Sequence, residues 1–233
     1  STQSIYQKGM LSCHGKTSIR ICLYLWNTIL HGRMQSVFNY LVSPKGARTT
    51  GQTTIDGQEL LLNTELQNHE YSNRVGVVLS LPLAEKYKEI KEGDEVIVHH
   101  NVFRRFRDVR GKEKNSKSYL TEETYLAQPD QIYAYRRNGE WKALEGFCFV
   151  MPVKETKMFS MDFEKPLIGL IKYSEEIGLD TLIGFRPTSE YEFIIDGQRL
   201  YRVPNNSITI NYGHKGNEEE YNPSWAQSSR GTH

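Results

Sequence analysis

The sequence predicts a mainly β protein in which two small β-barrels with irregular loops follow each other along the chain. The first reason is composition, because Tyr, Val, Ile and Thr are common and Ala is scarce, which favours strands over helices. The second reason is the spacing of turn-forming residues, because from residue 37 onward short apolar runs end at Pro, Gly, Asn or Asp. The third reason is repetition, because the same order of strands and turns occurs twice.

Residues 1–33 do not follow the pattern of the rest of the chain. They contain two of the three cysteines, no acidic residue and no clear alternation of apolar and polar positions. We expect an N-terminal extension that is extraneous to the folded body, with Met34 as the natural start. The alternative is a short helix over Ile21–Leu30, which is long enough for about three turns. No small-residue cleavage site follows this apolar run, so we do not expect a secretion signal.

We expect the first unit to cover residues 34–140 and to open with a strand that ends at Ser43-Pro44. A long, mostly polar stretch follows, and the apolar triplet Leu60-Leu61-Leu62 lies within it. Ile90–Asp94 is predicted to form a turn, and Asn138-Gly139 is a strong turn dipeptide. The expected strands of this unit are Val37–Val42, Val75–Leu81, Glu95–His99, Tyr125–Ala127 and Gln131–Tyr135.

The second unit, residues 141–213, repeats this order of elements in a shorter form. Asp196-Gly197 predicts a two-residue hairpin turn within Phe193–Tyr201. The other expected strands are Phe147–Val153, Ile168–Tyr173 and the end of Gly178–Phe185. We expect the link between the units at residues 138–145.

The last two strands of each unit carry the repeat most visibly. Leu200–Pro204 resembles Tyr125–Pro129, and Ile208–Ile210 resembles Ile132–Ala134 with one residue inserted. Residues 214–233 are expected to form a polar tail, part of which is held down by Tyr221–Trp225.

The charge balance and the cysteine count exclude several classes of protein. Lys and Arg number 29 and Asp and Glu 28, so the net charge of +1 excludes a protein that coats nucleic acid by charge alone. Cys13, Cys22 and Cys148 are too few for a disulfide framework or a zinc site, and such a sparse set suits a reducing compartment. No apolar run approaches the ~18 residues of a membrane-spanning helix. We therefore expect a cytoplasmic protein without a membrane partner.

The chain contains no motif that predicts an enzyme, a metal site or a cofactor. It has neither a phosphate-binding loop nor a dinucleotide fingerprint. His99 and His100 are neighbours in an expected strand and therefore point to opposite faces, which argues against a metal pair. Cys148 lies in an apolar strand and is expected in the core rather than as a nucleophile. Glu218-Glu219-Glu220 are neighbours in sequence, not a positioned acid–base pair.

The order of strands and turns in this sequence resembles that of a family, the GroES-type co-chaperonins (chaperonin-10), in a divergent form like those carried by bacteriophages. The resemblance covers Val37 to about Tyr135, and a second, degenerate copy covers Phe147 to about Tyr212. The best single match is Ile90–Val98, which is similar to the family segment "vk-x-GD-x-V-x-F". The other matching segments are Tyr40–Val42, the loop with Leu60-Leu61-Leu62, Arg74–Leu79 and Glu123–Tyr133.

The resemblance implies two tandem GroES-like barrels that cap a GroEL-like bacterial chaperonin ring and assist protein folding. It implies self-association into a ring, for which a heptamer is the family value, and a substrate protein, such as a phage protein, enclosed in the chamber. It implies no cofactor and no chemistry of its own. Location would be the cytoplasm, or the host cytoplasm if the protein is viral. Nucleic acid is not an expected partner in this reading.

The resemblance assigns the chaperonin-binding mobile loop to Leu60, Leu61 and Leu62. An apolar triplet in a polar loop binds weakly and reversibly, since the loop loses conformational entropy on docking, and several copies on a ring would add avidity. The alternative is an ordinary buried strand. The second copy has only Lys154–Lys165 where such a loop lies.

The resemblance also assigns a roof hairpin to the basic segment Asn101–Lys117, which holds seven basic and two acidic residues. A charged roof would keep the chamber wall wettable. Two alternatives stay open, a solvated loop and a single-stranded nucleic-acid contact, in which Phe103 and Phe106 interleave with arginines. A third reading of the whole chain is a phage structural or accessory protein. The basic residues of the expected hairpin are Arg104, Arg105, Arg107, Arg110, Lys112 and Lys114.

Overall fold

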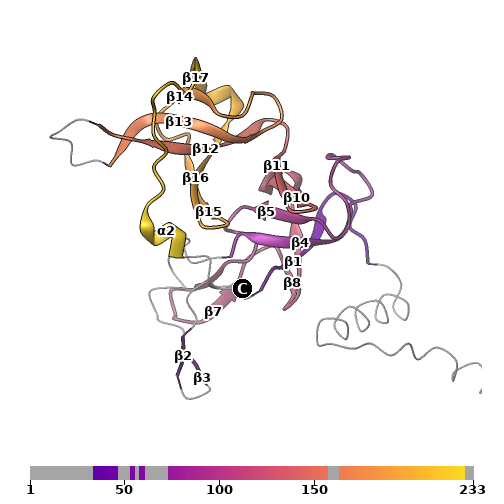
Figure 1. Ribbon diagram of the computed structural model, residues 1–233. Helices are drawn as coiled ribbons and strands as arrows, with labels where there is room; N and C mark the ends of the chain where they lie inside the picture. The colour runs from indigo at the N-terminus through magenta and orange to yellow at the C-terminus, as the bar shows by residue number, and fades with distance from the viewer. Residues whose placement is uncertain (1–33, 47–52, 56–57, 61–72, 157–162, 229–233) are drawn as a thin grey trace, which may run out of the picture. The chain divides into compact units, whose positions relative to one another are not determined.

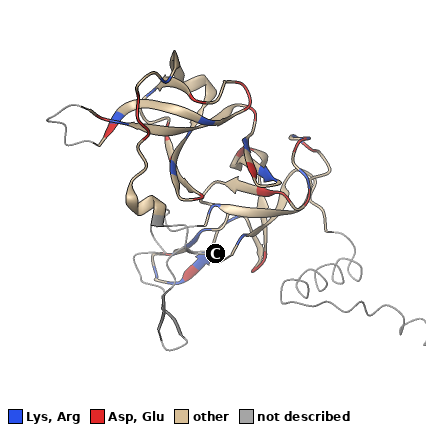
Figure 2. Cartoon of the chain, viewed as in Figure 1, with Lys and Arg blue, Asp and Glu red and all other residues tan. Residues whose placement is uncertain are grey.

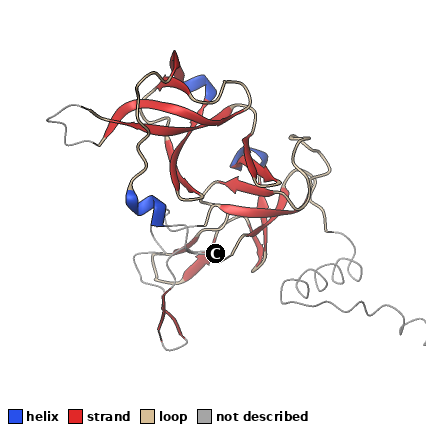
Figure 3. Cartoon of the chain, viewed as in Figure 1, coloured by secondary structure: helices blue, strands red, loops and turns tan. Residues whose placement is uncertain are grey.

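The computed structural model describes residues 34–46, 53–55, 58–60, 73–156 and 163–228 (Figure 1). The chain divides into two units, Ser1–Gln35 and Ser36–His233. The described part of the larger unit is mainly β, as predicted, and consists of antiparallel sheets with few short helices (Figure 3). Among the described residues, no helix is long and apolar enough to span a membrane.

The first sheet has seven strands in the order β11-β10-β5-β4-β1-β9-β8. A short 3-10 helix, η2 (Pro129–Gln131), joins β9 to β10. The strands are β1 (Tyr40–Pro44), β4 (Val75–Ser80), β5 (Glu95–Val98), β8 (Tyr119–Thr121), β9 (Thr124–Ala127), β10 (Ile132–Arg137) and β11 (Glu140–Ala143). Two small hairpins, β2 (Thr53–Ile55) with β3 (Gln58–Leu60) and β6 (Arg105–Arg107) with β7 (Glu113–Asn115), pair outside this sheet.

The second sheet has six strands in the order β15-β16-β12-β13-β14-β17. The 3-10 helix η3 (Asn205–Ser207) joins β16 to β17, and a short helix, α2 (Ser224–Ser228), follows. The strands are β12 (Phe147–Lys154), β13 (Glu164–Ser174), β14 (Thr181–Phe185), β15 (Tyr191–Ile195), β16 (Gln198–Pro204) and β17 (Ile208–His214). The strands of the first sheet are called the first repeat below, and those of the second sheet the second repeat.

The predicted closure into barrels is not present, because neither sheet closes on itself in the part of the chain that the structure describes. Closure needs pairing between the outermost strands of a sheet. Among the described strands, β8 pairs only with β9, and β11 pairs only with β10. Each sheet therefore has two faces to cover, and part of this surface is buried where the sheets meet.

The repeated order of elements is confirmed, because the two sheets have the same order of corresponding strands. Read from the hairpin strand, the first sheet has the order β8-β9-β1-β4-β5-β10, and the second sheet has the order β15-β16-β12-β13-β14-β17. Strands at the same place in these two orders correspond to each other, and the first sheet has β11 in addition. A β-bulge interrupts the first ladder at Leu41/Val42 and the equivalent ladder at Phe149/Val150. The domain boundaries at residues 140 and 213 stay a prediction.

The ladders correct one detail of the predicted repeat. In the first repeat Val42 faces Tyr125, and in the second repeat the equivalent Val150 faces Tyr201. Tyr125 therefore corresponds to Tyr201 rather than to Leu200. The spacing from this tyrosine to the isoleucine that opens the last strand is then equal in both repeats, so no residue is inserted. Pro129 lies four residues after Tyr125, whereas Pro204 lies three residues after Tyr201. Aligning the two segments on these prolines therefore shifts the equivalence by one residue.

A glycine opposite a proline occurs at the same place in both repeats. Gly76 faces Pro44, and Gly169 faces Pro152. A Cβ atom on Gly76 would lie 2.9 Å from the Phe103 ring and 3.0 Å from a backbone carbonyl oxygen of β1, and one on Gly169 would lie 2.8 Å from the equivalent carbonyl oxygen of β12. The first two strands of each repeat therefore approach too closely for a side chain at this position.

Side-chain alternation divides the core into three clusters. On β5, Val96 and Val98 face the interior of the first repeat, while Ile97 points to the other face and into a cluster shared by both sheets. On β12, Cys148 and Val150 face the interior of the second repeat. The shared cluster consists of Ile97, Tyr133, Ala134, Trp141, Ala143, Phe149, Met151, Phe193, Ile195 and Leu200.

The short-range turn predictions are confirmed. Asn138 and Gly139 both have positive φ, 55° and 89°, and join β10 to β11. Asp196 and Gly197, at 50° and 76°, join β15 to β16. Two consecutive residues with positive φ match the twist of a two-residue hairpin. The segment predicted as a link between the units thus contains a strand, β11, that extends the first sheet.

Candidate functional site

The predicted mobile loop leaves the first sheet between β1 and β4. Within it, β2 and β3 form a hairpin in which Ile55 faces Gln58 and Thr53 faces Leu60. Leu60 is the last residue of β3, whereas Leu61 and Leu62 lie outside the described residues. The assignment of this triplet to chaperonin binding stays a prediction. In the second repeat, only residues 155–163 separate β12 from β13.

The base of this loop is fixed on the sheet by hydrogen bonds. The Asn73 side-chain amide donates to the Lys45 carbonyl oxygen at 2.8 Å, and its Oδ1 accepts from the Val75 amide at 2.9 Å. The Lys45 amide in turn donates to the Val75 carbonyl oxygen at 2.9 Å. The two ends of the loop are therefore held together at the same end of β1 and β4.

The basic segment forms the hairpin β6–β7, inserted between β5 and β8 (Figure 2). Asp108 orders its tip, because its Oδ1 accepts from the Arg110 and Lys112 amides, both at 2.9 Å. Arg105 is half-buried and forms an ion pair with Glu113 at 3.2 Å. The exposed basic side chains of the segment are Arg107, Arg110, Lys112, Lys114 and Lys117, while Arg104 is half-buried.

The two phenylalanines of this segment have different environments. Phe103 is 1 % exposed and packs edge-on against Tyr125 in the core of the first repeat, with ring centroids 5.0 Å apart. Phe106 is 38 % exposed and faces Lys114 across the hairpin. The sequence pattern suggested two stacking aromatics, but Phe103 comes before the hairpin begins and is taken up by the core. Of the two rings, Phe106 is the one presented among the arginines.

Sequence reasoning missed a polar bridge between the two sheets, centred on Arg136. Its Nε donates to the Glu95 carboxylate at 2.9 Å, and its Nη1 donates to Asp196 Oδ2 at 2.8 Å. Asp196 Oδ2 also accepts from the Trp141 indole at 2.9 Å, and the Arg136 guanidinium lies 4.6 Å from the centroid of that ring. Glu95 and Arg136 belong to the first repeat and Asp196 to the turn of the second, so this network joins them.

Glu95 is the acidic centre of that bridge. Burial alone would raise the pKa of Glu95. Hydrogen bonds from Lys45 and Arg136, together with their positive charges, lower it by more than burial raises it, so the net pKa lies below the ordinary value of 4.5. Glu95 is therefore ionised in the folded protein at neutral pH. The residues of this bridge are spread along the chain from Lys45 to Asp196, and no local pattern could have predicted their contact.

Aromatic rings also surround a half-buried arginine, Arg202. The Arg202 guanidinium lies 4.7 Å from the Tyr133 ring centroid and 5.3 Å from that of Phe147. Burial lowers the pKa of Arg202 and raises that of Tyr133 to about 12. Rings from both repeats therefore enclose this cation, and the negative faces of their π systems stabilise its charge.

His99 and His100 correct the geometric argument made from the sequence. β5 ends at Val98, so the two histidines do not alternate across a strand, and their ring centroids lie 4.1 Å apart. Both rings stack on Tyr191, and the Tyr191 hydroxyl bonds to His100 Nδ1. Among the described residues, no group of three or more His, Cys, Asp or Glu side chains is placed to hold a metal ion.

The acidic triplet near the C-terminus forms ion pairs along the second sheet. Glu218 pairs with Lys165 at 2.6 Å, Glu219 with Lys154 at 3.3 Å and Glu220 with Lys172 at 2.7 Å. The expected attachment of Tyr221–Trp225 is also present, because the Tyr221 amide donates to the Pro152 carbonyl oxygen at 2.8 Å and Asn222 bonds to β16 and its turn.

Cys148 is fully buried in the second repeat, as predicted, and burial raises the pKa of its thiol to about 12. It is therefore protonated and unreactive at neutral pH. The described residues thus offer a loop base, a charged hairpin and a joint between two sheets. No protein-family model matches the chain, and no curated protein matches it.

Proposed function

We propose that this protein is a co-chaperonin that caps a GroEL-like chaperonin ring and assists folding of an enclosed protein, such as a phage protein. The observation that carries the proposal is the position of the two long insertions of the first repeat. One lies between β1 and β4 and the other between β5 and β8. These are the places where the resemblance to GroES-type proteins puts the mobile loop and the roof hairpin.

The proposal includes a GroES-like identity for each sheet and assembly of the chain into a ring, with a heptamer as the family value. It gives the two insertions separate tasks. Leu60, Leu61 and Leu62 dock on an apolar groove of the chaperonin, and avidity across the ring makes weak individual contacts sufficient. The exposed Arg107, Arg110, Lys112 and Lys114 line the chamber and keep its roof hydrated. No catalytic residue or cofactor takes part.

The test is co-sedimentation or native mass spectrometry with a bacterial chaperonin, with and without ATP. Wild-type protein is expected to form a complex that depends on nucleotide. Leu61→Asp is expected to abolish it, because a carboxylate cannot enter an apolar groove without losing its hydration. The matched control is Leu120→Asp, which alters an exposed leucine of β8 and leaves the loop intact. Unchanged binding by Leu61→Asp, or no binding by wild-type protein, contradicts the proposal.

A second candidate function is contact with single-stranded nucleic acid through the β6–β7 hairpin. It is favoured by one observation, the partly exposed Phe106 ring among basic side chains. Binding of a labelled oligonucleotide would then fall steeply with salt and weaken in Phe106→Ala. Phe103 is buried in the core and cannot stack on a base, so only one of the two expected stacking rings is available. This candidate is therefore the weaker one.

A further inference from the structure

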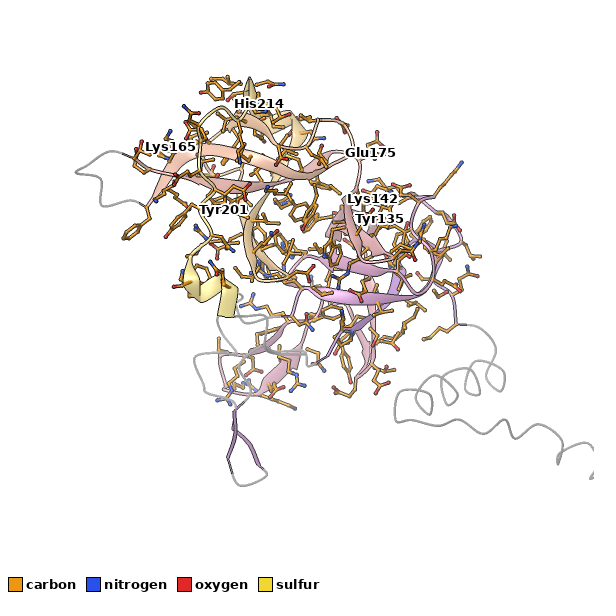
Figure 4. All side chains as sticks on the ribbon, viewed as in Figure 1. Tyr135, Lys142, Lys165, Glu175, Tyr201 and His214 are labelled. Carbon is orange, nitrogen blue, oxygen red and sulfur yellow. The ribbon has the colours of Figure 1, made fainter. Side chains whose placement is uncertain are left out.

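One arginine of the second sheet has no carboxylate acting on its charge among the described residues. Arg202 lies on β16, and its Nε is buried and donates no hydrogen bond in that part of the chain. Tyr201, the residue before it, is labelled in Figure 4. The other arginine of β16, Arg199, forms ion pairs with Glu164 and Glu192. A cation that is partly removed from water without an opposite charge costs free energy, so Arg202 needs a physical reason.

The first repeat shows that the shared strand order does not require an arginine at this position. Arg202 faces Phe149 in the second repeat, and Leu126 faces Leu41 at the equivalent place in the first. Leu126 is half-buried, as Arg202 is. An apolar side chain therefore fits this place in the scaffold, and the charge of Arg202 is specific to the second repeat.

Two further arginines, from the first repeat, act on the same place. The guanidinium carbon of Arg202 lies 5.7 Å from the Tyr191 ring centroid, and that of Arg74, just before β4, lies 5.1 Å from it. Arg74 Nη1 donates to the Glu192 carbonyl oxygen, which holds Arg74 against β15. Burial raises the pKa of Tyr191, and the positive charges of Arg74, Arg202 and Arg104 lower it. Arg74, Arg104 and Arg202 are called the arginine cluster below.

Two histidines add hydrogen-bond donors beside Tyr191. Their rings stack on the Tyr191 ring, with centroids 5.8 Å away for His99 and 5.7 Å away for His100. His99 Nδ1 accepts from the Asn101 amide at 3.1 Å, so neutral His99 carries its proton on Nε2, where it can donate to an anion. The arginine cluster, Tyr191 and both histidines are half-buried, so each side chain stays partly accessible to solvent.

The arginine cluster creates a positive potential at a half-buried place. Like charges repel more strongly there than in water, and an anion among them replaces repulsion with attraction. Guanidinium groups match both carboxylate and phosphate, which they bind through paired hydrogen bonds. Guanidinium groups from three separate segments favour phosphate, because its tetrahedral oxygens can face several directions, whereas a carboxylate has two oxygens in one plane.

We propose that the arginine cluster binds a phosphate group, either as free inorganic phosphate or as the phosphate of a small monoester. The ligand gives Arg202 the opposite charge that the described residues do not supply. Because Arg74 and Arg104 come from the first repeat and Arg202 from the second, the bound phosphate also stabilises the joint between them. This site goes beyond the proposed function and does not depend on chaperonin binding.

The experiment measures thermal unfolding and calorimetric binding of the full chain in inorganic phosphate, with sodium chloride at equal ionic strength as the reference. A ligand that binds only the folded state raises the melting temperature with its concentration, so phosphate is expected to raise it more than chloride does. The same titration with adenosine monophosphate distinguishes the two sources. Equal binding of both probes indicates that free phosphate is sufficient, and tighter binding of adenosine monophosphate indicates a monoester.

The variant Arg202→Leu introduces the residue type that the first repeat has at the equivalent place. Loss of a charged hydrogen-bond donor is expected to weaken phosphate binding about tenfold or more. Arg104→Gln is a second variant at a half-buried arginine of the cluster, and it keeps the test decisive if Arg202→Leu does not fold. Arg186→Gln, at an exposed arginine just after β14, is the matched control and should bind phosphate like wild type.

Three outcomes overturn the inference. The first is a wild-type chain whose melting temperature rises no more in phosphate than in chloride. The second is a phosphate response that either folded variant of the arginine cluster keeps at wild-type strength. The third is binding of an oligonucleotide that Arg202→Leu abolishes, while neither phosphate nor adenosine monophosphate binds, because the cluster would then contact a nucleic-acid backbone.

Discussion

The two repeats share one strand order but differ in the length of the connections between their strands. The first repeat has 30 residues between its first two strands and 20 between β5 and β8, where the second has 9 and 5. The bulge, the close approach of the first two strands and the 3-10 helix before the last strand are the same in both. The backbone scaffold is therefore common, and the insertions that carry the proposed contacts belong to the first repeat alone.

The comparison also shows which positions keep their residue type. Pro and the facing Gly are the same in both repeats, whereas the equivalent core residues Tyr40 and Cys148 differ in size and chemistry. Cores tolerate changes of side chain if the volume is redistributed, but a strand contact that excludes a Cβ atom admits only glycine. This difference explains why the repeat is easier to see in strand order than in sequence.

The largest expected effect comes from the joint between the repeats. Phe149 is fully buried in the cluster shared by both sheets, so Phe149→Ala should destabilise the protein by about 3–5 kcal/mol. Urea unfolding followed by Trp fluorescence measures this change. Phe163→Ala, at a mostly exposed ring, is the control and should change stability by less than about 1 kcal/mol. Equal effects of the two variants would mean that the shared cluster does not hold the repeats together.

The glycine positions test the equivalence of the repeats directly. Gly76→Ala and Gly169→Ala each force a methyl group against backbone, and each should destabilise the protein by about 1–3 kcal/mol. Gly178→Ala provides the control, since its Cβ would meet only an ordinary contact at 3.4 Å. Thermal and urea unfolding compare the three. A large effect at one glycine and none at the other would break the equivalence inferred from the ladders.

The smallest expected effect concerns the bridge at Arg136. Glu95 has a lowered pKa in the folded state, so its ionised form contributes stability above the ordinary value of 4.5, and this contribution is lost as the pH falls through the lower, folded value. Arg136→Gln should remove about 1 kcal/mol near neutral pH and flatten the loss of stability as the pH falls below the ordinary value. Arg107→Gln, an exposed arginine of the hairpin, should leave the pH dependence unchanged. An unaltered acid profile in Arg136→Gln would show that the bridge does not set it.

Features determined by neighbouring residues could be predicted from the sequence. The Asn138-Gly139 and Asp196-Gly197 turns, the mainly β class, the buried Cys148 and the attachment of Tyr221–Trp225 depend on local chemistry or on apolar patterning, and all are present. The repeated order of elements was visible for the same reason. These features require no knowledge of which strands become neighbours.

Features determined by distant residues could not be predicted. Whether a sheet closes depends on how its outer strands meet, and here β11 extends the first sheet instead of linking two barrels. The contact of Arg136 with Asp196 and the joint stacking of His99 and His100 on Tyr191 arise only when the sheets pack. The pattern of charges around Phe103 indicates a basic loop, but a charge pattern carries no information on burial, and Phe103 lies in the core. The role of Leu60, Leu61 and Leu62 stays a prediction.

The unequal connections have a consequence for the order of folding. Bringing the ends of a loop together costs entropy that grows with the logarithm of its length, so the 9-residue connection of the second repeat closes at about 1 kcal/mol less than the 30-residue connection of the first. The shorter link after β14 adds a similar advantage. In refolding from denaturant, the second repeat should therefore gain its ladder first, with the first repeat completing on it although it is nearer the start of the chain.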